Sequence, residues 1–157
     1  MPADRSQAAT AAILDIARRT LAIESAAVAR LETQIDNAFL AAVDILLGCQ
    51  GRVVVTGMGK SGHIGGKIAA SLASTGTPAF FMHPAEASHG DLGMITGEDV
   101  VIALSNSGES PEISAIVPLI KRRGARLISM TGNPGSTLAR TSDIHLNAGV
   151  EQEACPH

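Results

Sequence analysis

Aromatic side chains are scarce in this sequence, which has three phenylalanines and neither tyrosine nor tryptophan. Since 45 % of the residues are hydrophobic, the core of this globular chain must consist mainly of aliphatic side chains. Few rings remain on which nucleic acid bases could stack, and the net charge of −3 does not attract a phosphate backbone. Both features argue against nucleic acid binding.

Cysteine is also rare, and the two cysteines, Cys49 and Cys155, lie far apart in the sequence. This arrangement fits neither a disulfide framework nor a zinc motif, so we expect reduced thiols in the cytoplasm. The first residues lack the apolar segment of a secretion signal. No apolar run approaches the ~18 residues that a membrane-spanning helix needs. We therefore expect a cytoplasmic protein with no membrane segment.

The N-terminal region, residues 1–48, is rich in alanine and is expected to be helical from about residue 4. Apolar residues recur there at three- and four-residue spacing, and Gly48 ends the pattern as a helix cap. We expect two helices with a break near residues 20–25. Two roles remain open for them: they cover a sheet, or they form an interface between subunits.

From residue 52 onward, short β-branched runs alternate with helical stretches. The expected strands are residues 52–56, 78–82, 99–105, 126–131 and 143–147. The expected helices are residues 63–74, 111–123 and 136–140. Nearly continuous apolar strands that alternate with helices predict a parallel sheet covered on both faces. In such a sheet, ligands bind outside the carboxyl ends of the strands, where the strand order reverses.

A glycine-rich segment follows the first expected strand. Residues 57–62 match G-x-G-x-x-G, which suggests a dinucleotide site. We reject that interpretation, because the second strand ends at residues 81–83 without the acid that would bind a ribose. A P-loop is excluded as well, since its first glycine would fall at Val54. What remains is a tight turn that presents Lys60 and Ser61 at the edge of the sheet.

Three serines and a glycine separate the third strand from the next helix, in residues 105–110. Pro111 suits the first helical position, which makes Ser110 the N-cap. Backbone N–H groups at a helix start attract anions, and the serine hydroxyls add donors, so this loop is a candidate phosphate cradle. The alternative is a capped turn with spare serines. Glu112, in the first helical turn, either stabilises the helix start or acts as a base.

Another polar stretch, residues 83–91, contains His83, Glu86, His89 and Asp91. Three interpretations remain open for it. It is a metal site, an ordinary polar surface loop, or the source of a histidine that acts as an acid or base near neutral pH.

Five segments together resemble the arabinose-5-phosphate isomerases of the sugar isomerase (SIS) domain superfamily. They are residues 57–63, 74–78, 83–93, 105–110 and 153–156. The resemblance implies a single SIS domain over residues 1–157, with its α/β core in residues 52–157. It implies a three-layer αβα sandwich whose five-stranded parallel sheet is doubly wound as in flavodoxin. The implied reaction interconverts D-ribulose 5-phosphate and D-arabinose 5-phosphate through an enediolate, for synthesis of the lipopolysaccharide sugar Kdo.

The resemblance also implies roles for individual residues, with no cofactor and no metal. The catalytic residues would be Lys60 as oxyanion donor, His89 as proton shuttle and Glu112 as base. The phosphate would be bound by Ser61, Ser105, Ser107 and Ser110. Further substrate-site candidates are Gly59, His83 and Glu153. The expected partners are the phosphosugar, further copies in a homotetramer, and the sugar nucleotide CMP-Kdo as an inhibitor.

The sequence departs from its family at the C-terminal end. Family members usually continue into another helix and paired CBS modules, and they use a further histidine that has no counterpart here. We therefore expect a shortened chain with weak turnover, associated through its N-terminal helices, in which His157 is native or belongs to a tag. The alternatives are an isomerase of another phosphosugar, a metal-dependent isomerase, and a sugar-phosphate sensor without turnover.

Overall fold

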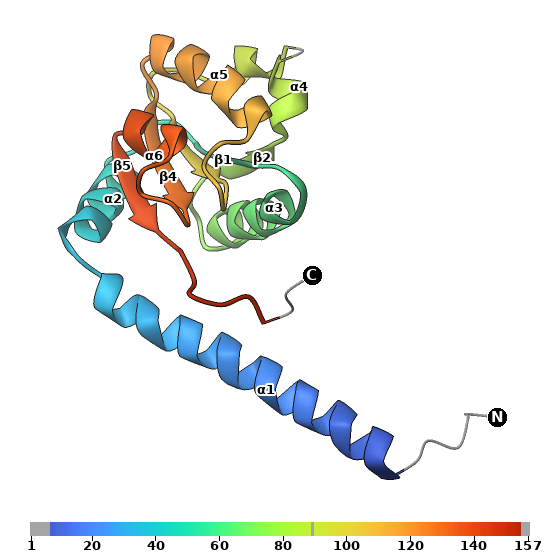
Figure 1. Cartoon of the computed structure of the whole chain (residues 1–157). Helices are drawn as coiled ribbons and strands as arrows, with labels where there is room; N and C mark the ends of the chain where they lie inside the picture. Colours follow the sequence, from blue (N-terminus) through green and yellow to red (C-terminus); the bar gives the residue numbers. More distant parts are fainter. Residues whose placement is uncertain (1–6, 89, 155–157) are drawn as a thin grey trace. The chain divides into compact units, whose positions relative to one another are not determined.

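The structure of the chain is a computed structural model that describes residues 7–88 and 90–154 (Figure 1). The predictions made for His89, Cys155 and His157 fall outside the described residues. The described chain separates into two compact units, residues 7–34 with 150–154, and residues 35–149. Among the described helices, none combines the length and the apolar character needed to cross a membrane.

The predicted helix break near residues 20–25 is wrong, because α1 (Gln7–Leu31) runs through it without interruption. That segment contains neither glycine nor proline, so nothing in it opposes helix formation. The chain leaves the α-helix in a 3₁₀ turn, Glu32–Gln34. Asp36 then starts α2 (Asn37–Leu47), because its carboxylate accepts the N–H groups of the first helical turn.

Most apolar side chains of α1 are exposed, and no residue of this helix is buried. Ile16, Leu21 and Val28 are 65 %, 66 % and 68 % exposed. An ion pair between Arg30 and Glu151 joins the helix to residues 150–154 within the same unit. The helix therefore carries apolar surface that its own unit does not cover.

The second unit contains a parallel sheet with the strand order β2-β1-β3-β4-β5. The strands are β1 (Val53–Gly57), β2 (Ala79–Met82), β3 (Val100–Leu104), β4 (Arg126–Thr131) and β5 (Ile144–Asn147). The predicted five-stranded parallel sheet is therefore confirmed. Since β2 lies on one side of β1 and β3 on the other, the strand order reverses between β1 and β3.

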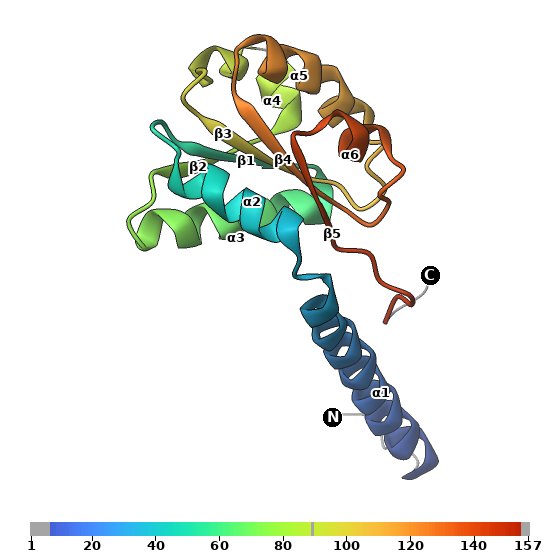
Figure 2. The same cartoon turned by 90° about the vertical axis from the view of Figure 1, so that its left-hand side faces the viewer.

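Helices cover both faces of the sheet (Figure 2). On one face lie α2 and α3 (Gly59–Ser74), and on the other lie α4 (Pro84–Ser88), α5 (Pro111–Arg122) and α6 (Thr137–Thr141). The predicted three-layer sandwich is confirmed. The two predicted helices at residues 111–123 and 136–140 are found within one residue at each end, whereas α3 begins four residues earlier than expected.

Aliphatic side chains of the central strands fill both layers of the core. Val54 and Val101 pack toward the face covered by α4 and α5, whereas Val53 and Val55 pack toward α3. All four are 0 % exposed. Because these strands are buried on both faces, they appear in the sequence as continuous β-branched runs.

Residues 83–91 were expected to form a polar stretch, one interpretation of which was a surface loop, but this part of the chain contains α4 and the start of a 3₁₀ turn, Asp91–Met94. Ala87 and Leu92 are 1 % and 6 % exposed and belong to the core on that face of the sheet. Burial of these two side chains fixes the path of a segment that has too few apolar residues to show a helical period.

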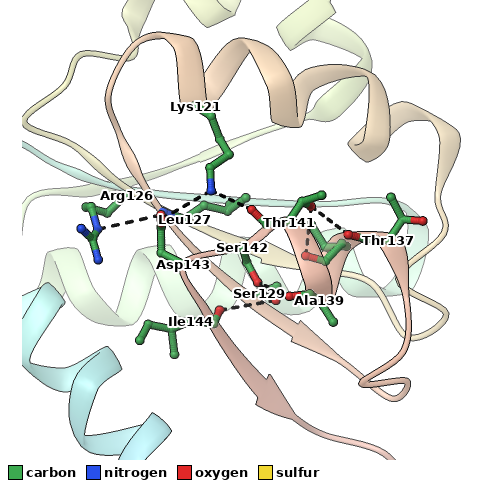
Figure 3. Close-up of polar contacts among 11 residues, drawn as sticks. Lys121, Arg126, Leu127, Ser129, Thr137, Ala139, Thr141, Ser142, Asp143 and Ile144 are labelled. Atoms are coloured by element: carbon green, nitrogen blue, oxygen red, sulfur yellow. Dashed lines mark hydrogen bonds and ion pairs between the residues drawn. The ribbon is translucent and has the colours of Figure 1, made fainter.

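Two aspartates tie the strands together at the amino edge of the sheet, where the strands begin. Asp143 accepts the Leu127 N–H at 2.7 Å and lies 3.4 Å from the Lys121 ammonium and 3.8 Å from the Arg126 guanidinium (Figure 3). It therefore connects the start of β4 with the start of β5 and with the end of α5.

Asp99, which is 2 % exposed, makes similar contacts at the starts of β1 and β3. Its two oxygens accept the Arg52 N–H at 2.7 Å and the Thr96 N–H at 2.8 Å. Burial raises the pKa of Asp99, but these hydrogen bonds and the charge of Arg52 outweigh that effect and hold the pKa below its ordinary value. The buried carboxylate therefore stays ionised and joins the start of β1 to β3.

Candidate functional site

Strand register brings the glycine-rich segment and the serine loop together. Gly57 at the end of β1 lies directly opposite Leu104 at the end of β3. Adjacent strands are about 4.8 Å apart, so residues 58–62 and 105–110 start side by side. Both leave the carboxyl edge at the point where the strand order reverses. This is where ligands of doubly wound sheets bind.

The glycine-rich segment forms the start of α3, so Lys60 and Ser61 lie in a helical turn and not in the tight turn that we expected. Gly59 has a φ of +52°, a left-handed conformation that favours glycine. Met58, the N-cap, offers no side-chain hydrogen bond to the helix. Among the described residues, the side chains of Lys60 and Ser61 have no hydrogen-bond or ion-pair partner. The free N–H groups and this lysine make the start of α3 electropositive.

The serine loop is folded by its own hydroxyl groups. The Ser105 hydroxyl oxygen, in a residue 7 % exposed, accepts the Gly108 N–H at 3.1 Å. The Ser107 hydroxyl oxygen accepts the Glu109 N–H at 3.2 Å. Since each hydroxyl acts as an acceptor in these bonds, its own proton remains available to an anion.

Ser110 is the N-cap of α5 and Pro111 occupies the first helical position, as predicted. The Ser110 hydroxyl does not cap the helix, however, and donates to the Glu112 carboxylate at 2.8 Å. The N–H of Glu112 itself, followed by the Ser110 hydroxyl, lowers the pKa of the Glu112 carboxyl, and the charge of His83 adds a smaller effect in the same direction. Glu112 is therefore an exposed, ionised carboxylate at neutral pH.

The starts of α2, α3, α5 and α6 fall into two classes. α2 begins with the Asp36 carboxylate bound to its first N–H groups, and α6 has the Ser136 hydroxyl in that place. α3 and α5 have no side-chain cap of this kind. These two uncapped helices are the ones that start at the reversal point, where their N–H groups favour an anion.

His83 follows β2 and lies level with Gly57, because its neighbour Met82 pairs with Thr56. Its Nδ1 accepts the Ala85 N–H at 3.3 Å. The ring is half-buried and meets Phe81 edge-on, with 6.5 Å between the ring centroids. His83 belongs to the same group of side chains, because it is near enough to Glu112 to lower the pKa of that carboxyl.

Two of the predicted site residues are not among the described residues of the second unit. His89 lies outside the described residues. Glu153 is exposed and belongs to the unit of residues 7–34 and 150–154. In residues 7–88 and 90–154, no three His, Cys, Asp or Glu side chains gather in a way that could hold a metal ion.

Glu109 received no role from the sequence, but the structure gives it a defined contact. Its carboxylate accepts the Thr137 N–H at 2.7 Å, at the start of α6. This hydrogen bond, then the Thr137 hydroxyl and the charge of Arg140, lower the pKa of Glu109. The two residues are 28 positions apart, and only the pairing of β3 with β4 brings them together. No sequence signal could have revealed this contact.

Comparisons with known proteins match the chain to a family over most of its length. The SIS domain family model matches residues 46–156. An arabinose 5-phosphate isomerase KdsD of Pseudomonas aeruginosa is 62 % identical over 89 % of this chain and 43 % of its own length. KdsD of Escherichia coli K12 is 56 % identical over 88 % of this chain and 42 % of its own length. The chain therefore spans about two fifths of the length of these curated relatives.

Solved structures share the fold. An Escherichia coli CFT073 protein in complex with arabinose 5-phosphate has a TM-score of 0.88 at 43 % identity, covering 92 % of this chain and 77 % of that one. A Listeria monocytogenes protein described as a putative sugar-phosphate isomerase has a TM-score of 0.90 at 33 % identity, covering 98 % and 79 % of the two chains. The family resemblance seen in the sequence is confirmed, and the chain belongs to the SIS domain family.

Proposed function

We propose that this chain is an aldose–ketose isomerase that interconverts D-ribulose 5-phosphate and D-arabinose 5-phosphate for Kdo synthesis. The observation that carries the proposal is the register pair Gly57 and Leu104, which sets two uncapped helix starts side by side. One of these starts bears Lys60 and the other bears Glu112. The KdsD relatives and the Escherichia coli CFT073 structure with arabinose 5-phosphate support this choice of substrate.

In this proposal the phosphate lies between the starts of α3 and α5. The hydroxyls of Ser61, Ser105, Ser107 and Ser110 donate to it, together with backbone N–H groups of both helices. Glu112 would repel a phosphate, so it faces the sugar carbons. When the phosphosugar binds, the Ser110 hydroxyl turns from Glu112 to the phosphate. Glu112 then loses one of the hydrogen bonds that lower its pKa. Binding of the phosphosugar thereby makes Glu112 a stronger base.

The chemistry moves one proton between neighbouring carbons. The Glu112 carboxylate takes the proton from the carbon next to the carbonyl group, which leaves an enediolate. The Lys60 ammonium stabilises the negative oxygen, and Glu112 returns the proton to the other carbon. His89 moves the proton between the two oxygens. A positioned acid or base is worth roughly 10²–10⁴-fold in rate, and an oxyanion donor about 10²–10³-fold.

An assay with ribulose 5-phosphate, with and without a chelator, tests the function. We expect arabinose 5-phosphate to form at the same rate in both conditions. Loss of turnover with the chelator would establish the metal-dependent alternative instead. Tight binding of the phosphosugar without turnover would identify a sensor. Faster turnover of another phosphosugar would show that this other compound is the substrate.

We also propose that α1 associates with further copies of the chain to form a homotetramer. Its exposed Ile16, Leu21 and Val28 support this role, since apolar surface of this kind tends to be buried by association. Sedimentation should show that Leu21→Glu dissociates the assembly. The control Asp15→Arg, which changes an exposed charge at neither three- nor four-residue spacing from these three side chains, should leave it intact.

The remaining proposals concern regulation and location. CMP-Kdo, expected from the family resemblance, should slow the isomerase reaction when it is added to the same assay.

The cytoplasm is the proposed location, which the sparse cysteines of the sequence support.

A further inference from the structure

The serine loop is bonded to the segment that follows β4. The Glu109 carboxylate accepts the Thr137 N–H at 2.7 Å, and the Gly108 carbonyl accepts the Leu138 N–H at 3.1 Å. Consecutive residues of the loop therefore bind consecutive residues of α6. A loop held at two adjacent points can neither slide along α6 nor rotate away from it as long as both bonds persist.

The start of α6, against which the serine loop packs, is buried and capped. Ser136 is 0 % exposed, and its hydroxyl accepts the Ala139 N–H at 3.3 Å. Gly108 lies directly against it with a φ of +67°, and a Cβ at this glycine would overlap the Ser136 side chain. The loop therefore rests on a buried and capped helix start, and a residue larger than glycine would displace it.

Glu109 is also hydrogen-bonded to a serine side chain of the loop. Its N–H donates to the Ser107 hydroxyl at 3.2 Å, while its carboxylate accepts from Thr137. A shift of the Glu109 backbone therefore moves the Ser107 hydroxyl directly. It also moves Gly108, whose N–H donates to the Ser105 hydroxyl.

On the basis of the proposed function, we infer that Glu109 is a positioning residue for phosphosugar binding. By accepting the Thr137 N–H, it holds Ser105 and Ser107 in the arrangement that presents their hydroxyl protons to the phosphate. Its negative charge is compatible with a nearby phosphate because the carboxylate is bound to Thr137 and attracted by Arg140. Glu109 acts through the loop and does not touch the substrate.

Two pairs of variants separate positioning from a direct role. Glu109→Ala removes the acceptor, whereas Glu109→Gln keeps an oxygen that accepts the same N–H. Thr137→Pro removes the N–H and leaves Glu109 intact, whereas Thr137→Ser keeps both the N–H and the hydroxyl. Proline suits this site, because Thr137 is the first residue of α6 and Ser136 has the extended conformation, φ −69° and ψ 159°, that precedes a proline.

The affinity for inorganic phosphate and the KM for ribulose 5-phosphate are measured for the wild type and all four variants. We expect Glu109→Ala and Thr137→Pro to weaken phosphate binding and raise KM by about tenfold, the effect of one hydrogen bond to a charged group. Glu109→Gln and Thr137→Ser should stay within about threefold of the wild type, well below that effect. Thermal unfolding checks that each variant folds.

Wild-type affinity in both disruptive variants would overturn the inference. Equal damage by Glu109→Gln and Glu109→Ala, together with a harmless Thr137→Pro, would also overturn it, since the carboxylate charge would then act on the ligand itself. The phosphate titration distinguishes this failure from that of the proposed function. A wild type that binds phosphate but does not turn over ribulose 5-phosphate contradicts the isomerase proposal alone, and one that binds no phosphate contradicts both.

Discussion

The two edges of the sheet use polar side chains in different ways. At the amino edge, Asp99 and Asp143 are bound to backbone N–H groups of the neighbouring strands and face basic side chains. At the carboxyl edge, Lys60 and Ser61 have no such partners among the described residues, and the starts of α3 and α5 have no side-chain caps. One edge holds the strands together, and the other keeps its hydrogen-bonding groups available to a ligand.

This difference has a thermodynamic reason. A buried carboxylate without partners is very costly, so Asp99 requires its full set of hydrogen bonds for the protein to fold. At the carboxyl edge Lys60 and Ser107 are exposed, and water satisfies their polar groups until an anion replaces it. Substitutions at the amino edge should therefore reduce stability, whereas substitutions at the carboxyl edge should reduce binding and turnover.

The largest effect is expected for Lys60→Ala at the carboxyl edge. Removing the donor to the negative oxygen should lower turnover about 10²–10³-fold. The free energy of unfolding should change little, because the side chain is exposed and has no partner among the described residues. Steady-state kinetics and urea denaturation measure the two effects. Lys67→Ala, an exposed lysine on the same helix, is the control and should match the wild type in both.

Asp99→Asn should show the reverse pattern at the amino edge. An amide cannot accept both N–H groups as the carboxylate does, so the free energy of unfolding should fall by about 1–3 kcal/mol. Because folding lowers the Asp99 pKa, its stabilisation is fully present above the ordinary value of 3.8 and is lost as the pH falls through the folded-state pKa. The difference between wild type and variant should therefore shrink in acid. A variant with wild-type stability at pH 7, or with reduced phosphosugar affinity, would contradict the division between the edges.

Ser107→Ala should weaken phosphosugar binding by about tenfold and leave the fold intact. Its hydroxyl is exposed, so it contributes to the ligand more than to the fold. Calorimetry with arabinose 5-phosphate measures the effect, and arabinose without phosphate should not compete. Ser74→Ala, at the far end of α3, serves as the matched control. Equal affinities of Ser107→Ala and the wild type would remove the serine loop from the phosphate site.

The smallest effect is expected for Thr56→Val at the end of β1. The Thr56 hydroxyl is buried and has no hydrogen-bond partner among the described residues. Replacing it with a methyl group should raise the free energy of unfolding by about 1 kcal/mol, because an unsatisfied buried hydroxyl is unfavourable. Ser129→Ala is the contrast, since the buried Ser129 hydroxyl is bonded to Ser142 at 2.7 Å and its loss should destabilise the protein. Destabilisation by Thr56→Val would indicate that its hydroxyl has a partner in solution.

The sheet was predictable because each strand is a short run of buried apolar residues, and β4 was found at the predicted residues, 126–131. The predicted helix break at residues 20–25 was wrong, because a weaker apolar pattern does not end a helix in a segment that lacks glycine and proline. The short helix α4 has too few residues for a period to show. In the site, the serine loop and Glu112 were visible as local motifs, whereas the contact of Glu109 with Thr137 depends on the pairing of strands.

The central claim, that the carboxyl edge of the sheet carries the chemistry, is tested most directly by Glu112→Gln. The measurement is the exchange of the carbon-bound proton of arabinose 5-phosphate with deuterated solvent, together with the affinity for the phosphosugar. We predict that the variant binds the phosphosugar with an affinity close to that of the wild type but loses the exchange, because an amide cannot accept the proton. Exchange at the wild-type rate would contradict the account and leave Glu112 as a charge that stabilises the start of α5.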